Sequence, residues 1–419
     1  MKFTSTEATP APHVPPGVLR LTGAAKEDIP MYRIQTMNKI SPVGLNRFPS
    51  ELYEVGDAVQ DPQGILVRSA KLLDLEFNPS LLAIARAGVG VNNIPLDRCA
   101  AAGIPVFSTP GANANAVKEL VICAMLMGSR DIPGAIRWVR EQAASGVDVS
   151  TVVEKGKSAF IGPELYKKTL GIIGLGAIGS IVANTAISLG MDVYGYDPFL
   201  SVDTALRLDR HVHVVKDIND LYKRSNYITM HIHYTEKTAH MIDADAIAAM
   251  KRGVRVINLA RGEIVDDEAM LTALDTGMVA AYITDFPNNR LLTAPHVIAM
   301  PHLGASTPES EQNCAAMAVD TLRDYLESGN IRSSVNLPEM SMERSGVQRL
   351  CILHKNVPGM LANITSLFGR DGVNVENLSN KSRGDYAYTM VDLSTKVGER
   401  VVEDVKHMPN VIRVRVLEW

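Results

Sequence analysis

Residues 170–179 read LGIIGLGAIG, and residues 191–197, a short helix's length further on, read MDVYGYD. The apolar run before the glycines predicts a buried strand, the residues after them predict a helix, and the second run predicts the next parallel strand. Gly174 allows a tight turn, Gly176 lets a ligand approach the backbone, and Gly179 lets the helix pack closely on the strand. This order of elements predicts the βαβ unit of a doubly wound α/β fold.

The same unit predicts a site for NAD. The free N–H groups at the helix start, around Ala177 and Ile178, would face the pyrophosphate at the positive end of the helix dipole. Asp197 follows Gly179 by 18 residues, close to the roughly 20 expected for an acid that binds the ribose hydroxyls. A 2′-phosphate would meet a like charge there, so NAD is favoured over NADP. The alternative is a glycine-rich turn that packs a helix and binds no ligand.

Composition bounds the class of protein. A chain of 419 residues with 46% hydrophobic and 21% charged residues predicts a globular protein of two or three domains. The net charge of −4 provides no basic field for nucleic acid or a membrane surface. The four cysteines show neither metal-ligand spacing nor a disulfide framework, which favours a reducing cytoplasm. The Pro-rich residues 1–30 are expected to be a flexible extension, and the longest apolar run is too short to span a bilayer.

Strands alternate with helices along most of the chain. After residue 170 we expect strands at 170–174, 191–196, 212–215, 227–232, 254–259, 279–284 and 297–300, which indicates a parallel sheet. Earlier, we expect strands at 64–67, 81–85 and 104–107 and helices at 115–130 and 132–144; a long helix is expected at 308–328. The C-terminal residues predict a ferredoxin-like βαββαβ unit. The expected division is 31–130 with 305–332, 131–304, a linker at 333–346, and 347–419.

Three polar residues follow predicted strands, where catalytic loops lie in such sheets. Arg261 can hold a carboxylate or polarise a carbonyl, His302 can carry a proton near neutral pH, and Asp285 can accept from a nicotinamide carboxamide. A surface arginine, a structural histidine and a loop acid are the alternatives. Together with a dinucleotide, these residues suit hydride transfer from a hydroxyl carbon.

Four segments resemble the D-2-hydroxyacid dehydrogenase family: RAGVGVNN at 86–93, the glycine fingerprint with Asp197, INLARG at 257–262 and PHLGAST at 301–307. The resemblance runs from about Met31 to Trp419. It implies a Rossmann-type NAD domain inserted in a flavodoxin-like substrate domain. It also implies that Arg261 orients the substrate and that His302 is the acid/base. The implied cofactor-binding residues are Gly174, Gly176, Ala177, Ile178, Gly179, Asp197, Ala260, Asp285 and Gly304.

The resemblance also implies a substrate site. The loop at Gly88 and Val89 matches the backbone N–H groups that hold the substrate carboxylate, and Arg68 with Ser69 matches the surroundings of a substrate phosphate. Further candidates for this dianion are Lys39, Arg47 and Arg86, and we expect at least two of the four cations in the site. The implied activity is NAD-dependent oxidation of 3-phosphoglycerate, the first step of L-serine biosynthesis, in a homodimer or homotetramer. Two alternatives stay open: an enzyme for glycerate, glyoxylate or lactate, and a catalytically silent NAD-binding regulator.

The C-terminal unit resembles an ACT domain, in which His354, Asn356 and Asn374 match positions that contact L-serine as effector. The alternative is an oligomerisation module that has lost its ligand. One departure from the family stands near the active site. Asn289 occupies the position where the family usually places a glutamate hydrogen-bonded to the catalytic histidine. An amide can orient an imidazole but cannot stabilise imidazolium by charge.

Overall fold

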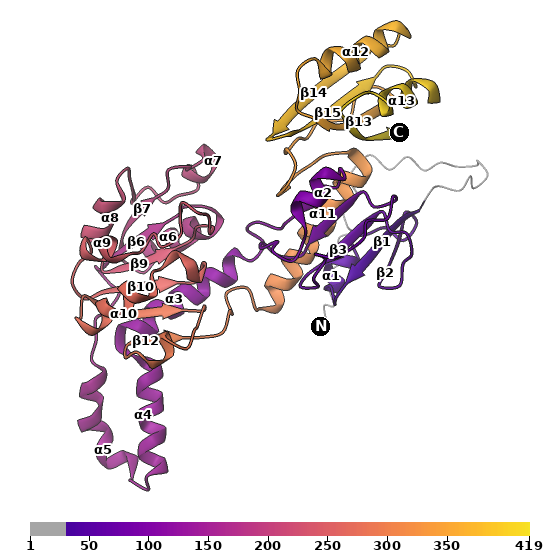
Figure 1. Ribbon diagram of the computed structural model, residues 1–419. Helices are drawn as coiled ribbons and strands as arrows, with labels where there is room; N and C mark the ends of the chain where they lie inside the picture. The colour runs from indigo at the N-terminus through magenta and orange to yellow at the C-terminus, as the bar shows by residue number, and fades with distance from the viewer. Residues whose placement is uncertain (1–30) are drawn as a thin grey trace, which may run out of the picture.

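Three β-sheets follow one another along the chain in the computed structural model, which describes residues 31–419 (Figure 1). The extension predicted for residues 1–30 lies outside the described residues. Within the described part, no helix combines the length and the apolar character needed to cross a membrane.

The first sheet is parallel, with the strand order β2-β1-β3-β4-β5 of flavodoxin-like folds. Its elements are β1 (Tyr32–Met37), α1 (Pro42–Leu45), β2 (Tyr53–Gly56), β3 (Gly64–Val67), β4 (Ala83–Arg86), α2 (Leu96–Ala101) and β5 (Val106–Phe107). The chain returns to this sheet with helix α11 (Pro308–Ser328), which buries Ala318 and Leu322 against Ile34 and Leu66. Residues far apart in the sequence therefore share one core.

The second sheet is also parallel, with the order β12-β11-β10-β9-β6-β7-β8. Its strands are β6 (Thr169–Ile173), β7 (Asp192–Tyr196), β8 (Val212–Val215), β9 (Tyr227–Met230), β10 (Val254–Asn258), β11 (Val279–Thr284) and β12 (Val297–Ala299). Its helices are α6 (Ala177–Ser188), α7 (Val202–Ala205), α8 (Ile218–Arg224), α9 (Ala244–Ala248), η2 (Gly262–Ile264), α10 (Asp267–Asp275) and η3 (Leu291–Thr293). The direction of winding reverses between β6 and β9, and ligands bind at such a switch point in open α/β sheets.

Helix α3 (Ala114–Arg130) packs on the second sheet. Its apolar stripe, which includes Val121 and Met125, is buried with Ile172 and Ile283 from that sheet. The predicted division after residue 130 therefore needs correction, because the structure places the change of domain before this helix. The helical period predicts that one face of this helix is buried, but it does not indicate which of the two sheets covers that face.

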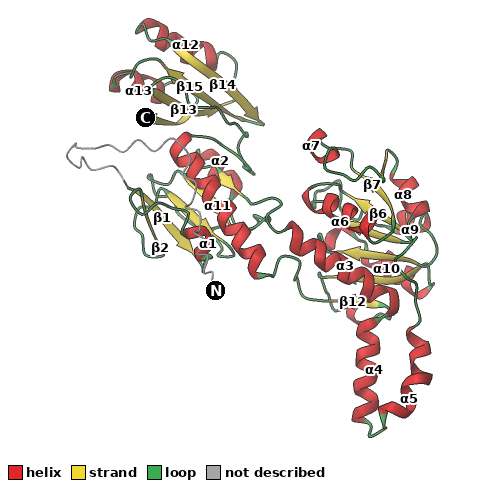
Figure 2. Cartoon of the chain, turned by 180° about the vertical axis from the view of Figure 1, so that it is seen from behind, coloured by secondary structure: helices red, strands yellow, loops and turns green. Residues whose placement is uncertain are grey.

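Two helices form an arm that projects from the second domain (Figures 1 and 2). They are α4 (Ile132–Ala144) and α5 (Val149–Gly156), followed by the short helix η1 (Lys157–Phe160). None of the three contains a buried residue, and even the apolar side chains of Ile136 and Val139 are 50% and 39% exposed. The arm therefore presents an apolar surface that residues 31–419 do not cover.

The third sheet is antiparallel, with the order β14-β15-β13-β16. Its elements are β13 (Gln348–Lys355), α12 (Met360–Arg370), β14 (Val375–Arg383), β15 (Tyr386–Leu393), α13 (Glu399–Lys406) and β16 (Val411–Glu418). Helices α12 and α13 cover one face, where Ile364 and Val405 join its core. The other face buries Leu353, Tyr388 and Met390 in the core of the first domain.

The predicted linker at 333–346 is a packed segment, and most of its apolar side chains are buried. Leu337 is fully buried and Met340 is 2% exposed, and the backbone of Met340 pairs with Ile331. Arg349 of β13 forms a completely buried ion pair with Asp392 and also donates to carbonyl groups of this segment. Polar composition predicted a linker, but these contacts between distant residues join the third domain to the first.

Candidate functional site

The glycine turn has the geometry of an anion site. Gly174 has a φ of +91°, and a Cβ on it would lie 2.6 Å from the carbonyl oxygen of His231. A Cβ on Gly179 would lie 1.9 Å from the carbonyl oxygen of Gly174. Gly176, by contrast, faces open space, and no side chain caps the N-terminus of α6, where Ala177 and Ile178 begin the helix. Free N–H groups and an open backbone suit a pyrophosphate.

Asp197 is fixed at the carboxyl end of β7. Its Oδ2 accepts from the N–H of Leu175 at 2.9 Å, and its Oδ1 accepts from the N–H of Phe199 at 2.8 Å. Each carboxylate oxygen has further acceptor capacity, since an ionised carboxyl group offers about four lone-pair positions. The carboxylate is thus oriented beside the glycine turn and can still receive the two hydroxyls of a ribose.

Two guanidinium groups lie against the loop at 88–90, and the charge of a third acts on one of them. Arg86 Nη1 lies 2.8 Å from the position of a Cβ on Gly88, and Arg261 Nη2 lies 3.3 Å from that of a Cβ on Gly90. The Nε of Arg86 donates to the carbonyl of Arg68 at 3.0 Å. Burial lowers the pKa of Arg86, and the positive charges of Arg261 and Arg68 lower it further. We call these three side chains the arginine cluster; it joins residues of the first and second domains and can hold a polyanion.

The four predicted phosphate-binding cations differ in their surroundings. Arg68 and Arg86 belong to the arginine cluster, where Arg68 also pairs with Glu311 of α11 at 2.6 Å. Arg47 is held by both carboxylate oxygens of Asp320, at 2.6 and 2.7 Å. Lys39 is exposed just beyond the end of β1.

The loops after β3 and β10 are held by amide side chains. Asn38 accepts from the N–H groups of Ser69, at 3.1 Å, and Ala70, at 2.6 Å, and fixes the loop that carries Arg68. Asn258 donates to the carbonyl of Arg261 at 2.8 Å and accepts from the N–H of Ala260 at 3.1 Å. Sequence reasoning missed both asparagines, since an asparagine near a loop carries no signal of the bonds it will make.

His302 and Asp285 line one cavity of about 750 Å³. Asp285 directly follows β11 and His302 follows the neighbouring strand β12, which pairs with β11 through Thr284. The ring of Phe286 lies 4.8 Å from that of His302, and His302 is exposed. Adjacent parallel strands thus place the predicted acid/base and the predicted carboxamide acceptor at the same edge of the sheet.

Asp285 is a buried carboxylate without a hydrogen-bonding partner. It is 1% exposed, and neither oxygen accepts a hydrogen bond from any residue within 31–419. Burial raises its pKa, which the positive charge of His302 and the nearby backbone N–H groups of Leu303 and Gly304 oppose. A Cβ on Gly304 would lie 3.6 Å from Oδ2. Buried acceptors are nearly always satisfied in folded proteins, so this carboxylate fits a donor brought by a ligand, as a carboxamide would be.

Asn289 does not take the place of the family's glutamate. It is exposed, and no hydrogen bond joins it to His302 in the described part of the chain. Its neighbour Asn288 lines the cavity instead and donates to Asp267 at 2.7 Å. The two catalytic candidates lie on separate loops, since Arg261 follows β10 and His302 follows β12. No hydrogen bond joins their side chains among residues 31–419.

The three predicted effector residues do not form one site within a chain. The ring nitrogens of His354 already bond the carbonyl of Lys355, at 2.8 Å, and Thr389 Oγ1, at 2.9 Å. Asn356 follows the end of β13, whereas Asn374 precedes β14 at the opposite end of the sheet, as the register of both strands with β15 shows. A ligand that contacts Asn356 and Asn374 together would need a second copy of the domain.

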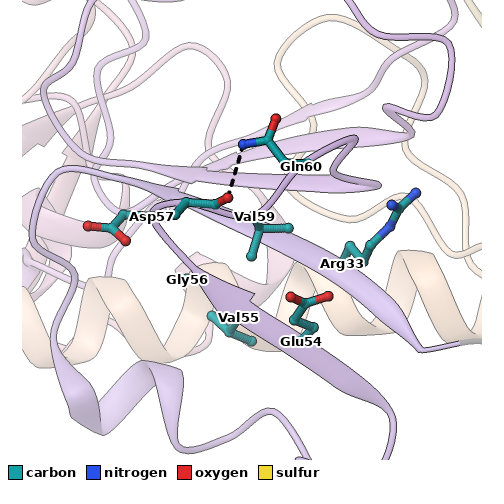
Figure 3. A pocket seen from close by; sticks show the side chains of 8 residues that line it. Arg33, Glu54, Val55, Gly56, Asp57, Val59 and Gln60 are labelled. Carbon is teal, nitrogen blue, oxygen red and sulfur yellow. Dashed lines mark hydrogen bonds between the residues drawn. The ribbon is translucent and has the colours of Figure 1, made fainter.

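A second cavity, of about 380 Å³, lies on the outer edge of the first sheet (Figure 3). Arg33 and Glu54 line it, and its rim is closed by a hydrogen bond from Gln60 to the carbonyl of Ala58. None of the predicted site residues lines this cavity, and it therefore takes no part in the site described above.

Comparison with known proteins places these features in context. The profile of the D-isomer specific 2-hydroxyacid dehydrogenase NAD binding domain matches residues 122–304, and that of an AHAS small subunit-like ACT domain matches residues 350–413. D-3-phosphoglycerate dehydrogenase of Haemophilus influenzae is 32% identical over 87% of this chain and 88% of its own length. The enzyme of the same name from Synechocystis is 35% identical over 75% of this chain.

The match to the first curated relatives is partial, since the chain spans 55–60% of their length. Among solved structures, NAD⁺-bound 3-phosphoglycerate dehydrogenase of Entamoeba histolytica is 26% identical, with a TM-score of 0.57 over 73% of this chain and 99% of that one. D-mandelate dehydrogenase of Rhodotorula graminis, at 21% identity and a TM-score of 0.63, shares the fold over 75% of this chain.

Proposed function

We propose that this chain, which belongs to the D-isomer specific 2-hydroxyacid dehydrogenase family, oxidises the C2 hydroxyl of 3-phospho-D-glycerate with NAD. The observation that carries this proposal is the arginine cluster at the loop 88–90, where Arg86 and Arg261 lie against the glycines and Arg68, paired with Glu311 of α11, adds a third positive charge. A carboxylate and a phosphate on one small substrate require fixed cationic donors of this kind. The orphaned carboxylate of Asp285 and the open backbone at Gly176 fit the cofactor.

The residues divide the work as follows. The backbone N–H of Val89 binds the substrate carboxylate beside Gly88, whose own N–H donates to the carbonyl of Arg86 at 2.9 Å and would have to leave it to join, and Arg261 orients the carboxylate and polarises the oxygen at C2. Arg68, with Ser69, and Arg86 bind the phosphate. His302 accepts the proton of the hydroxyl group, for which an imidazole is suited near neutral pH. The bound nicotinamide supplies the hydride acceptor. The turn at 174–179 and Asp197 hold the cofactor, with Ala260 and Gly304 lining its nicotinamide end.

The test compares two arginines that each form an ion pair with an acidic residue, one inside and one outside the proposed phosphate site. Arg68 and Arg47 each pair with an acid of α11, but only Arg68 belongs to the arginine cluster. Oxidation of NADH at 340 nm is measured with phosphohydroxypyruvate and with unphosphorylated hydroxypyruvate. We expect Arg68→Met to raise KM for the phosphorylated substrate by about 10- to 100-fold, as loss of one or two charged hydrogen bonds predicts, and Arg47→Met to leave it unchanged. Equal rates with glyoxylate or hydroxypyruvate would instead support the other dehydrogenase, and no turnover would support the regulator.

We propose a homodimer formed through the projecting arm and the exposed side of α3. The support is that α4, α5 and η1 bury no residue within residues 31–419 while Ile136 and Val139 present apolar surface. Exposed apolar patches of this kind mark interfaces.

We further propose that L-serine binds between two ACT domains and inhibits the enzyme. The support is that Asn356 and Asn374 lie at opposite ends of one sheet and that β14 is an edge strand. Calorimetry with L-serine and D-serine tests this. We expect a heat of binding with L-serine but not with D-serine, and we expect this heat to be lost in Asn374→Ala. The absence of heat at millimolar L-serine would favour a module that only joins subunits.

A further inference from the structure

We infer that the third domain positions Arg68, one of the proposed phosphate-binding arginines, through helix α11. Side chains of the third domain hold one end of this helix, and Glu311 near the other end holds Arg68. Glu311 is thus a positioning residue, since it acts on the substrate through Arg68. This inference deepens the proposed function and rests on it only where substrate affinity is measured.

The C-terminal end of α11 is capped by the third domain. The last four carbonyl groups of a helix have no partner within it, and they carry the negative end of the helix dipole. Arg415 of β16 donates to two of them, the carbonyls of Tyr325 at 3.0 Å and Leu326 at 2.8 Å. Its side chain is 9% exposed, so these bonds are shielded from water.

The carbonyls at the end of the helix are held in the same way. Arg349 of β13 donates to the carbonyl of Ser328 at 2.8 Å, and the hydroxyl of Tyr388 on β15 donates to that of Gly329 at 2.7 Å. Three strands of one sheet therefore bond the end of α11. A displacement of this sheet must either break buried hydrogen bonds or move the helix with it.

The opposite end of α11 reaches the arginine cluster. Glu311, in the first turn, accepts from Nη2 of Arg68 at 2.6 Å. This bond uses one of the five N–H donors of the guanidinium, and the other four have no partner among residues 31–419. The charge of Arg86 lies nearby and repels Arg68, whose side chain is 44% exposed and could otherwise turn into solvent. Glu311 thus keeps Arg68 beside Arg86 and leaves donors free for a phosphate.

The helix between these two ends is continuous. Its 21 residues make it about 30 Å long, and after Pro308 at its start it contains neither proline nor glycine, where helices usually kink. It runs from beside the third domain toward the second domain (Figures 1 and 2). A shift imposed at the capped end is therefore expected to reach Glu311.

Two arginines of β16 provide the test. Arg415 and Arg413 both donate to backbone carbonyls of the first domain, but Arg413 donates to Leu81 and not to α11. KM is measured with phosphohydroxypyruvate and with hydroxypyruvate. We expect Arg415→Met to raise KM for the phosphorylated substrate by about two- to fivefold, which corresponds to loss of a partly exposed ion pair. KM for hydroxypyruvate should not change, and Arg413→Met should change neither value.

Glu311→Ala tests the other end of the helix. It should raise KM for phosphohydroxypyruvate by the same two- to fivefold, whereas Glu309→Ala, which removes an exposed acid of the same turn, should leave it unchanged. In the Glu311→Ala background, Arg415→Met should have no further effect, because the link to Arg68 is already broken. A fall in KM in Glu311→Ala, or a full effect of Arg415→Met without Glu311, would overturn the inference.

Hydrogen exchange separates this inference from the proposed function, because it requires no substrate. The amides of Ser69 and Ala70, next to Arg68, donate to Asn38 and report the stability of that loop. Their exchange should be faster in Arg415→Met and unchanged in Arg413→Met, even if the chain fails to reduce phosphohydroxypyruvate. Equal exchange in the two variants would refute the link. If Arg415→Met does not fold, Tyr388→Phe removes one hydroxyl from the same cap and provides the same readouts.

Discussion

Replacing Gly176 by alanine is expected to weaken NADH binding and to leave the fold unchanged. No heavy atom lies within 4 Å of the added Cβ, and the φ of −67° is one that alanine adopts readily. The free energy of unfolding should therefore change by less than about 0.5 kcal/mol, as for an exposed site. The methyl group would, however, stand where the pyrophosphate approaches the backbone.

The loss of affinity can be estimated from the bonds at risk. Keeping the pyrophosphate away from the N-terminus of α6 removes at least one charge-assisted hydrogen bond, worth about 1.5–3 kcal/mol. This corresponds to roughly 10- to 150-fold in the dissociation constant of NADH. Isothermal titration calorimetry measures this constant, and a thermal melt of the same sample reports the stability.

Gly179→Ala is the matched control. Its Cβ would lie 1.9 Å from the carbonyl oxygen of Gly174, so the helix and the turn must separate. Overpacking of this kind costs about 1–3 kcal/mol, and each kcal/mol lowers Tm by roughly 2–4 °C in a domain of this size. This variant should lose both stability and affinity. If Gly176→Ala lowered Tm as much as Gly179→Ala, or bound NADH as tightly as the parent chain, the account of the turn would be refuted.

Three further predictions follow from other parts of the molecule. Burial lowers the pKa of His231 to about 4, so the folded state disfavours its protonation. The contribution of neutral His231 to the free energy of unfolding is complete above pH 6.5 and is lost as pH falls toward 4, by up to about 3 kcal/mol. In His231→Asn, the unfolding free energy measured with urea should therefore depend less on pH across this window. Arg349→Met leaves Asp392 buried and unpaired and should cost about 3–5 kcal/mol, much of which Arg349→Met with Asp392→Leu should recover, as chemical denaturation can measure. The double variant Ile136→Glu, Val139→Glu should have the mass of one chain in light scattering, because the two carboxylates would lie in the proposed interface. Its far-UV circular dichroism should match that of the parent chain, because neither side chain is buried within the described residues.

Much of the fold could be predicted from the sequence because its signals are local. Strands β8 and β11 and helices α4 and α11 begin and end at the predicted residues, since each has a clear period and a clear stop. The family and its NAD-binding domain could be predicted for the same reason: the glycine turn and the segment at 301–307 are short motifs whose chemistry depends on spacing. Helix α5 was missed, because its eight residues make only about two turns, too few for a helical period to be recognised.

The site was predictable only in part. Asp285 and His302 could be placed near each other, because each follows a strand of the same parallel sheet and those strands end at one edge. Whether Arg68, Lys39, Arg47 or Arg86 faces that site could not be decided, since each is a cation in an irregular segment. The structure shows their neighbours: Asp320 holds Arg47 and Glu311 holds Arg68, but only Arg68 also lies close enough to Arg86 to act on it.

The order of the elements, the glycine turn and the residues that can do chemistry could all be inferred from short stretches of the chain. Contacts between distant residues decide that α3 covers the second sheet, that Leu337 and Met340 of the segment at 333–346 join a core shared with the third domain, and that the carboxylate of Asp285 has no hydrogen-bond donor among residues 31–419. The physical reason is the range of the interactions. Periodicity and turn geometry depend on residues a few positions apart, whereas burial, ion pairing and the field at a titrating group depend on which distant residues come into contact.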